Sequence, residues 1–191
     1  MKKKVVLIGA STGGPGHLKK LLKDLPSNIK VPIVVAQHMS SVFIPSFVQQ
    51  FKTELKSPVL RLHEDRQIEQ GGVYICEKNC VFSNKRGIHV SFSLAPAQTL
   101  YNPSIDALFA SATCLCDDYE VLSIILTGIG HDGASGMVDL QRNGARCIAE
   151  SEESAVVFGM PKKAQEIVPN VKVLSLDRIK RELEEFVNVF F

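Results

Sequence analysis

The sequence lacks an excess of charge of either sign, and it lacks long hydrophobic runs. Its 191 residues carry 22 Lys and Arg against 20 Asp and Glu, a formal net charge of +2. This balance argues against a chain built to grip nucleic acid, and no nucleic-acid partner is expected. No apolar run approaches the ~20 residues that span a bilayer, so no membrane insertion is expected. Long Pro-, Gly- or Ser-rich tracts are also missing, which argues against a largely disordered chain.

Cysteine and histidine are present but do not cluster. The five cysteines form no CxxC pair, and their spacing fits neither a zinc site nor a disulfide framework. The histidines form no HxH, HxxxH or His/Cys cluster, so neither a metal nor a cofactor is expected. We interpret the cysteines as reduced packing thiols of a cytoplasmic protein. They are Cys76, Cys80, Cys114, Cys116 and Cys147.

Unbroken apolar runs alternate with helical patterns along most of the chain. This alternation predicts a three-layer α/β fold with a mainly parallel, doubly wound sheet covered on both faces. Residues 60–92 break the rhythm with short strands and turns, which predicts an antiparallel hairpin region at one edge. The expected strands are Lys4–Ile8, Pro32–Ala36, Val121–Leu126, Arg146–Ala149 and Val171–Leu174, with Val73–Cys76, Val81–Ser83 and Ile88–Phe92 in the hairpin region; the expected helices are Gly16–Lys23, Ile44–Leu55, Pro103–Cys114, Ala134–Asn143 and Ile179–Val187.

Ser11 lies in a G-x-S-x-G segment, Gly9-Ala10-Ser11-Thr12-Gly13, between an expected strand and an expected helix. That context is typical of a nucleophile elbow, in which small neighbours permit a sharp turn and free N–H groups at the helix start stabilise an oxyanion. The alternative is a Gly-rich phosphate loop. Ser11 then occupies the place of the middle glycine, and no acidic residue ends the next strand. The segment alone leaves both interpretations open.

His38 and Asp132 each follow a further expected strand. Because parallel strands end at one edge of the sheet, both side chains are expected near Ser11. Asp132 would then orient His38, although a glycine turn with Asp132 capping the next helix is the structural alternative. His131 is the rival base, but its neighbour Asp132 is poorly placed to face it. The order Ser11, His38, Asp132 differs from the Ser, Asp, His order of α/β-hydrolases, which disfavours that superfamily.

Several segments together resemble the catalytic domain of the bacterial chemotaxis protein-glutamate methylesterase/protein-glutamine glutaminase family. The resemblance implies a serine esterase acting on glutamate γ-methyl esters in the cytoplasmic helices of methyl-accepting chemoreceptors, with glutamine deamidation as a second activity. The matching segments occur in the family's order: Ile8–Gly14, Gln37–Met39, Pro103–Asp106, Leu126–Ala134 and Val156–Pro161.

The resemblance also implies residue roles. Ser11 becomes the nucleophile, His38 the general base and then acid, and Asp132 the orienting carboxylate. The residues expected to line the substrate and the oxyanion are Thr12, Gly13, Ile129 and Gly130. The competing interpretations are a non-catalytic receptor-binding adaptor and a nucleotide- or phosphate-binding module that uses the Gly9–Gly14 turn.

Three departures from the family bear on substrate contacts but leave the triad intact. Asn102 stands where the family usually has Arg, Ile129 where it has Met, and Ser40-Ser41 where it has Pro-Pro. Family members usually carry an N-terminal receiver domain. We expect residues 1–191 to form a single methylesterase catalytic domain, without a receiver domain in this chain, and to be monomeric.

Overall fold

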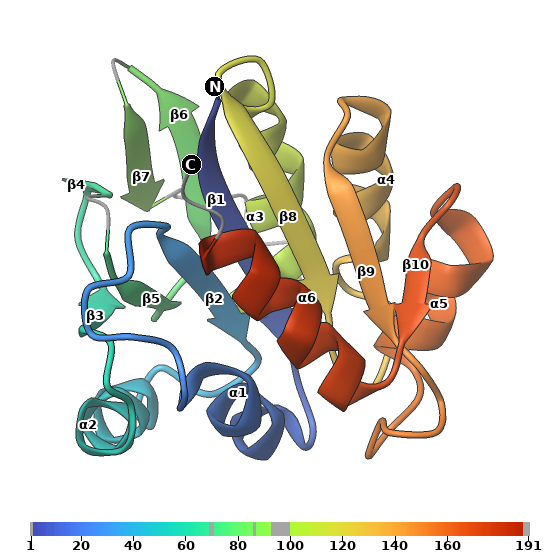
Figure 1. Ribbon diagram of the computed structural model, residues 1–191, viewed down its shortest axis with the longest axis horizontal. Helices are drawn as coiled ribbons and strands as arrows, with labels where there is room; N and C mark the ends of the chain where they lie inside the picture. Colours follow the sequence, from blue (N-terminus) through green and yellow to red (C-terminus); the bar gives the residue numbers. More distant parts are fainter. Residues whose placement is uncertain (1, 69–70, 86, 93–99, 189–191) are drawn as a thin grey trace.

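The computed structural model describes residues 2–68, 71–85, 87–92 and 100–188. Its elements are labelled in Figure 1. In chain order they are β1 (Lys3–Ala10), α1 (Gly14–Leu22), β2 (Ile33–Gln37), α2 (Ile44–Glu54), β3 (Val59–Leu62), β4 (Arg66–Gln67), β5 (Val73–Cys76), β6 (Cys80–Asn84), β7 (Ile88–Phe92), α3 (Ile105–Ser111), the 3-10 helix η1 (Ala112–Leu115), β8 (Tyr119–Ile125), α4 (Ala134–Arg142), β9 (Arg146–Glu150), α5 (Met160–Ile167), β10 (Lys172–Leu174) and α6 (Leu176–Asn188).

The main sheet has the strand order β10-β9-β8-β1-β2-β5-β3, and all neighbouring strands are parallel. The central strand β1 lies between β2 and β8, so the winding of the chain changes side at β1. The carboxyl ends of β1, β2, β8 and β9 point to the lower edge in Figure 1. In doubly wound sheets, ligand sites lie at the carboxyl edge where the winding reverses.

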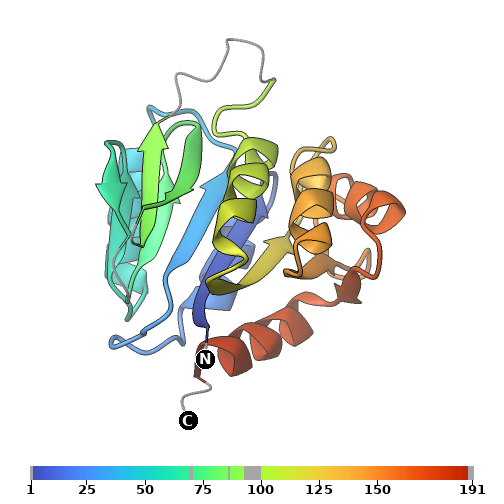
Figure 2. The ribbon, with the colours of Figure 1, turned by 90° about the horizontal axis from the view of Figure 1, so that it is seen from above.

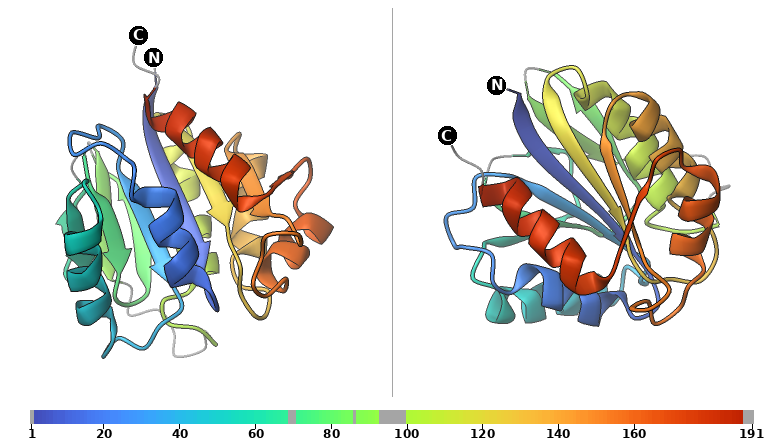
Figure 3. Two further views of the ribbon diagram at one scale, coloured as in Figure 1. Left: turned by 60° about the horizontal axis from the view of Figure 1, so that its bottom comes forward. Right: turned by 45° about the vertical axis from the view of Figure 1, so that its right-hand side comes forward.

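Helices cover both faces of this sheet. Helices α1, α2 and α6 pack on one face, and α3, α4 and α5 lie on the other (Figures 2 and 3). Alternate residues of β1 serve the two layers: Val6 and Ile8 belong to the first, and Val5 and Leu7 to the second. A strand buried on both faces has no need of polar residues, which explains its unbroken apolar run. The predicted three-layer α/β fold is confirmed.

In the region of residues 60–92 the expected antiparallel hairpin is present, as β6 paired with β7, but the placement of one expected strand differs from the prediction. Strand β5, expected in the hairpin region, lies inside the main sheet and pairs in parallel with β2 and β3. All four of its residues are buried, which suits a strand covered on both faces. Strands β4, β7 and β6 form a separate antiparallel three-stranded sheet instead of extending the main one.

The predicted helices agree with the structure apart from their ends. The helix expected over Pro103–Cys114 begins after Ser104, whose side chain caps it by accepting from the Ala107 N–H, and continues beyond Ser111 as the 3-10 helix η1. Helix α5 is absent from the predicted set. It buries few residues (Met160, Pro161 and Ala164), so its apolar face is too short to produce a clear periodic pattern.

Candidate active site

The ends of β1, β2 and β8 bring three predicted loops together at the carboxyl edge. The His38 N–H donates to the Ala10 carbonyl at 2.9 Å, and the Ser11 N–H donates to the Thr127 carbonyl, just after β8, at 3.0 Å. Gly13 then turns the chain into α1 with φ of 83°, a left-handed conformation that favours glycine. Ser11 therefore lies between the strand that leads to His38 and the loop that contains Asp132.

His38 and Asp132 are joined directly. His38 Nε2 lies 2.7 Å from Asp132 Oδ2, in hydrogen-bond contact. Only 10% of the His38 side chain and 3% of the Asp132 side chain are exposed, so solvent screens this contact weakly. The structure thus brings together two of the three residues to which the sequence assigns catalytic roles.

Backbone donors at the start of α3 hold Asp132 in place. The Ile105 N–H donates to Asp132 Oδ2 at 2.8 Å, and the Asp106 N–H donates to Oδ1 at 2.9 Å. Burial raises the pKa of Asp132, but the hydrogen bond with His38 and these two N–H groups outweigh burial and hold the pKa below its ordinary value. Asp132 does not cap the following helix: Gly133 occupies the N-cap of α4, without a side-chain cap.

Ser11 is partly exposed on its turn. Within the described residues, no hydrogen bond joins its hydroxyl to His38. Because Asp132 engages Nε2, Nδ1 is the ring nitrogen left for another partner. Catalytic hydrogen bonds often tighten only when substrate is bound, and a serine hydroxyl changes partner by rotation about χ1. The roles of Ser11, His38 and Asp132 stay predictions.

Tyr101 is a neighbour of His38 that sequence reasoning missed. The two rings stack, with centroids 4.4 Å apart and planes inclined by 4°. A Cβ atom on Gly130 would lie 2.5 Å from the Tyr101 hydroxyl, and Gly130 has φ of 87°, so glycine suits this position for both reasons. The only signal in the sequence is an aromatic residue just before the Asn102-Pro103-Ser104 segment.

Gln37 is a second missed neighbour. It is buried, and its Nε2 donates to the Ser11 carbonyl at 2.9 Å and to the His38 carbonyl at 3.1 Å. A Cβ atom on Gly14 would meet Gln37 Oε1 at 2.1 Å, so the glycine leaves room for this side chain. Gln37 therefore ties the backbone of the two loops together.

The predicted lining residues border the same region. Thr12 is exposed on the turn beside Ser11, and Ile129 is 61% exposed in the loop after β8. Gly13 lies beneath Val156, which is itself 62% exposed: a Cβ on this glycine would be 2.7 Å from the Val156 Cβ. No observation assigns these residues a ligand, and their lining role stays a prediction.

Other groups considered from the sequence lie outside this cluster. His131, the rival base, is exposed. Cys114 is exposed, the other four cysteines are buried, and all five are free thiols. The described ranges contain no group of three or more His, Cys, Asp or Glu arranged to hold a metal ion. None of the described helices combines the length and apolar character needed to cross a membrane.

Comparison with known proteins finds relatives of this chain in sequence and in structure. The sequence profile of the CheB methylesterase family matches residues 6–183. The chain is 35% identical over 190 residues to protein-glutamate methylesterase/protein-glutamine glutaminase 2 of Carboxydothermus hydrogenoformans, covering 97% of this chain and 54% of that protein. It is 37% identical over 187 residues to the protein-glutamate methylesterase/protein-glutamine glutaminase of Halalkalibacterium halodurans, covering 94% and 54%. The chain thus spans about half the length of these curated relatives.

The crystal structure of the CheB methylesterase catalytic domain of Thermotoga maritima has the same architecture. The two structures superpose with a TM-score of 0.87 at 30% sequence identity, over 98% of this chain and 100% of the other.

Proposed function

Because the chain belongs to the CheB methylesterase family, we propose that it is a serine hydrolase of protein glutamate γ-methyl esters. Its proposed substrates are the cytoplasmic helices of methyl-accepting chemoreceptors, and its second proposed reaction is glutamine deamidation. One observation carries the proposal: His38, at the end of the strand beside Ser11, makes a 2.7 Å contact with the buried Asp132 carboxylate.

In the proposed acylation step, the Ser11 oxygen attacks the ester carbonyl carbon and its proton passes to His38 Nδ1. Asp132 accepts the hydrogen bond from Nε2–H and stabilises the imidazolium that forms. The tetrahedral intermediate then collapses, the C–OCH3 bond breaks, and the leaving oxygen takes the proton from Nδ1. Methanol departs and Ser11 remains as an acyl ester.

Deacylation repeats these steps with water as the nucleophile. His38 Nδ1 takes a proton from water, hydroxide adds to the acyl carbon, and the returning proton releases the Ser11 hydroxyl. The product is a glutamate side chain. For glutamine the same sequence releases ammonia instead of methanol.

Backbone donors are available for the negative charge that develops on the carbonyl oxygen. The N–H groups of Thr12 and Gly13, next to Ser11, make no hydrogen bond with the described residues. They precede α1, whose N-terminus favours negative charge. Ile129 and Gly130 line the opposite side of the reaction centre in this proposal.

Substitution of Ser11 by Ala tests the proposal. Methanol release from a methylated cytoplasmic receptor fragment should fall by about 10³-fold or more, as when other triad nucleophiles are removed. The circular dichroism spectrum should be unchanged, because the Ser11 hydroxyl makes no contact that the fold requires. Ser46→Ala, at an exposed position of α2, is the matched control and should keep the parental rate.

Two outcomes would contradict the proposal. Near-parental methanol release by Ser11→Ala would remove Ser11 from the nucleophile role. A parent protein that binds the methylated fragment but releases no methanol would favour the non-catalytic adaptor instead.

A further inference from the structure

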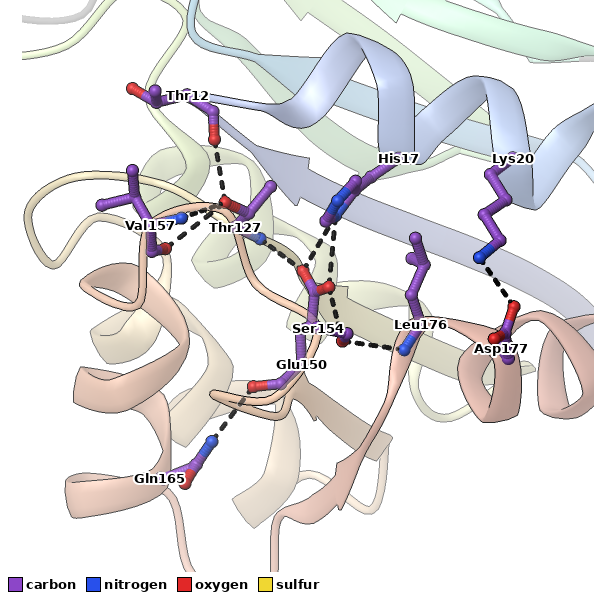
Figure 4. A network of polar contacts seen from close by, with 10 residues as sticks. All are labelled: Thr12, His17, Lys20, Thr127, Glu150, Ser154, Val157, Gln165, Leu176 and Asp177. Atoms are coloured by element: carbon purple, nitrogen blue, oxygen red, sulfur yellow. Dashed lines mark hydrogen bonds and ion pairs between the residues drawn. The ribbon is translucent and has the colours of Figure 1, made fainter.

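A buried carboxylate lies beside the candidate site but outside the triad. Glu150, the last residue of β9, is fully buried. Its Oε2 accepts from the Thr127 N–H at 2.8 Å, and its Oε1 accepts from the Ser154 hydroxyl at 2.8 Å. Figure 4 shows this carboxylate at the centre of a polar network that joins the loops after β1, β8 and β9. Burying a carboxylate is costly unless it is paired, so this network needs an explanation.

His17 supplies the partner. It projects from α1, its Nδ1 lies 3.2 Å from the Glu150 carboxylate, and only 13% of its side chain is exposed. Among the described side chains, His17 is the one whose ring nitrogen contacts the Glu150 carboxylate. Together with the Thr127 N–H and the Ser154 hydroxyl, this contact fixes the position of the carboxylate that holds Thr127.

Thr127 links the Glu150 carboxylate to the turn formed by Ser11 and Thr12. It is fully buried, and its carbonyl accepts the Ser11 N–H at 3.0 Å. Its hydroxyl donates to the Thr12 carbonyl at 2.9 Å and accepts from the Val157 N–H, also at 2.9 Å. One threonine, held from behind by Glu150, therefore bonds to both residues of the Ser11-Thr12 turn.

Gly128, the residue after Thr127, packs closely against the Ser11 side chain. A Cβ atom on Gly128 would lie 2.6 Å from the Ser11 Cβ, so the backbone of residue 128 is in close contact with that side chain. A shift of Thr127 by a fraction of an ångström would therefore move Ser11 through a hydrogen bond and through steric contact. Displacements of about 1 Å cost up to about 10²-fold in rate at a reacting centre.

We propose that the contact between His17 and the buried Glu150 is a positioning device that sets the place of Ser11 by holding Thr127. The proposal rests on the hydrolase function proposed above. Neither His17 nor Glu150 lies among the residues expected to contact substrate, so the pair acts on the chemical step. Its loss lowers kcat and leaves KM almost unchanged.

Three substitutions test the device with the same methylated receptor fragment. Glu150→Ala removes the acceptor of the Thr127 N–H, and kcat should fall by about 10- to 100-fold with KM within about twofold. Glu150→Gln retains an oxygen that can accept from Thr127 and should restore most of kcat. His17→Ala leaves the carboxylate in place without its histidine partner, and its kcat should lie between those of the two Glu150 variants. In the double variant His17→Ala/Glu150→Ala the losses should be less than multiplicative, because both act through one contact.

A second readout isolates Ser11 from substrate recognition. A small fluorophosphonate probe should modify Ser11 more slowly in Glu150→Ala than in the parent, as followed by mass spectrometry below the unfolding temperature of both. Two controls separate positioning from general loss of stability. Lys20 lies on α1, as His17 does, and Lys20→Ala breaks its exposed ion pair with Asp177 of α6. Ser57→Ala removes a buried hydroxyl that donates to the Pro26 carbonyl. Both should keep the parental kcat and labelling rate.

The outcomes distinguish this inference from the proposed function. A parent without methanol release overturns the function and the device together. With an active parent, a folded Glu150→Ala that keeps kcat within twofold, or that changes only KM, overturns the device alone. If Glu150→Ala does not fold, His17→Ala and Glu150→Gln decide: parental kcat and probe labelling in both overturn the device, and a larger loss in His17→Ala supports it.

Discussion

At the scale of the residue, Asp132 shows how burial and hydrogen bonding compete. Burial favours the neutral carboxyl, yet His38 and the N–H groups of Ile105 and Asp106 favour the ionised form and prevail, which lowers the pKa of Asp132. Asp132 therefore remains ionised down to pH values well below neutral. A change in activity between about pH 5 and pH 8 must then come from a group other than Asp132, and a histidine base is the residue type that titrates there.

Asp132→Asn should lower kcat/KM by about 10²- to 10⁴-fold, because the amide can misorient the ring and leaves the imidazolium without a counter-charge. The measurement is kcat/KM of methyl ester hydrolysis across the pH range.

Two variants serve as controls for that profile. Asp139→Asn changes an exposed carboxylate on α4, and His131→Gln changes the exposed histidine beside Asp132. Both should keep the parental profile. An inactive His131→Gln beside an active His38→Gln would reverse the assignment of the base.

At the scale of the element, α4 begins after Gly133, and the first residue of α3, Ile105, packs closely against that glycine. Gly133 has φ of 91°, and a Cβ atom there would lie 2.6 Å from Ile105 Cγ2. Ile105 in turn donates its N–H to Asp132. The packing of α3 against the loop before α4 is therefore part of what orients the carboxylate.

Gly133→Ala should lower the free energy of unfolding by about 2–4 kcal/mol, since backbone strain at positive φ adds to the clash with Ile105. It should also lower kcat by about tenfold, because Ile105 must shift. Gly144→Ala is the matched control: Gly144 has φ of 87° but nothing within 4 Å of its Cβ position. That variant should lose only about 1–2 kcal/mol and keep kcat. Equal losses of stability and equal rates in the two variants would contradict this account. Urea unfolding and initial rates measure both.

At the scale of the whole molecule, one parallel sheet serves two apolar layers. Phe51 of α2 packs in one layer and Phe109 of α3 in the other, and both are buried. Because each inner strand contributes to both layers, neither layer can lose its packing without exposing a face of the same strands. The molecule should therefore unfold as one cooperative unit.

Phe51→Ala and Phe109→Ala should each lower the free energy of unfolding by about 3–5 kcal/mol, the usual cost of removing a buried phenylalanine side chain. Each should shift a single urea transition that far-UV circular dichroism and tyrosine fluorescence report at the same midpoint. Separate transitions for the two probes would show that the layers unfold independently.

The periodicity of the chain determined most of the fold. Within the run Lys4–Ile8, the four residues after Lys4 are all apolar, and that pattern requires a strand covered on both sides. The position of Ser11, His38 and Asp132 after three such runs was likewise enough to predict one shared edge, because parallel strands end together. The placement of β5 was not predicted correctly, because a four-residue apolar run does not show whether the neighbouring strands are parallel or antiparallel.

The tertiary structure decided what surrounds those residues. Tyr101 stacks on His38, the N–H groups of α3 hold Asp132, and the His17–Glu150 pair holds Thr127. These partners come from elements far apart in the sequence, and a side-chain contact between them leaves no periodic pattern along the chain. Local sequence specifies which face of an element is apolar. The partner of a buried polar group depends on how the elements pack against one another, and only the folded chain determines that.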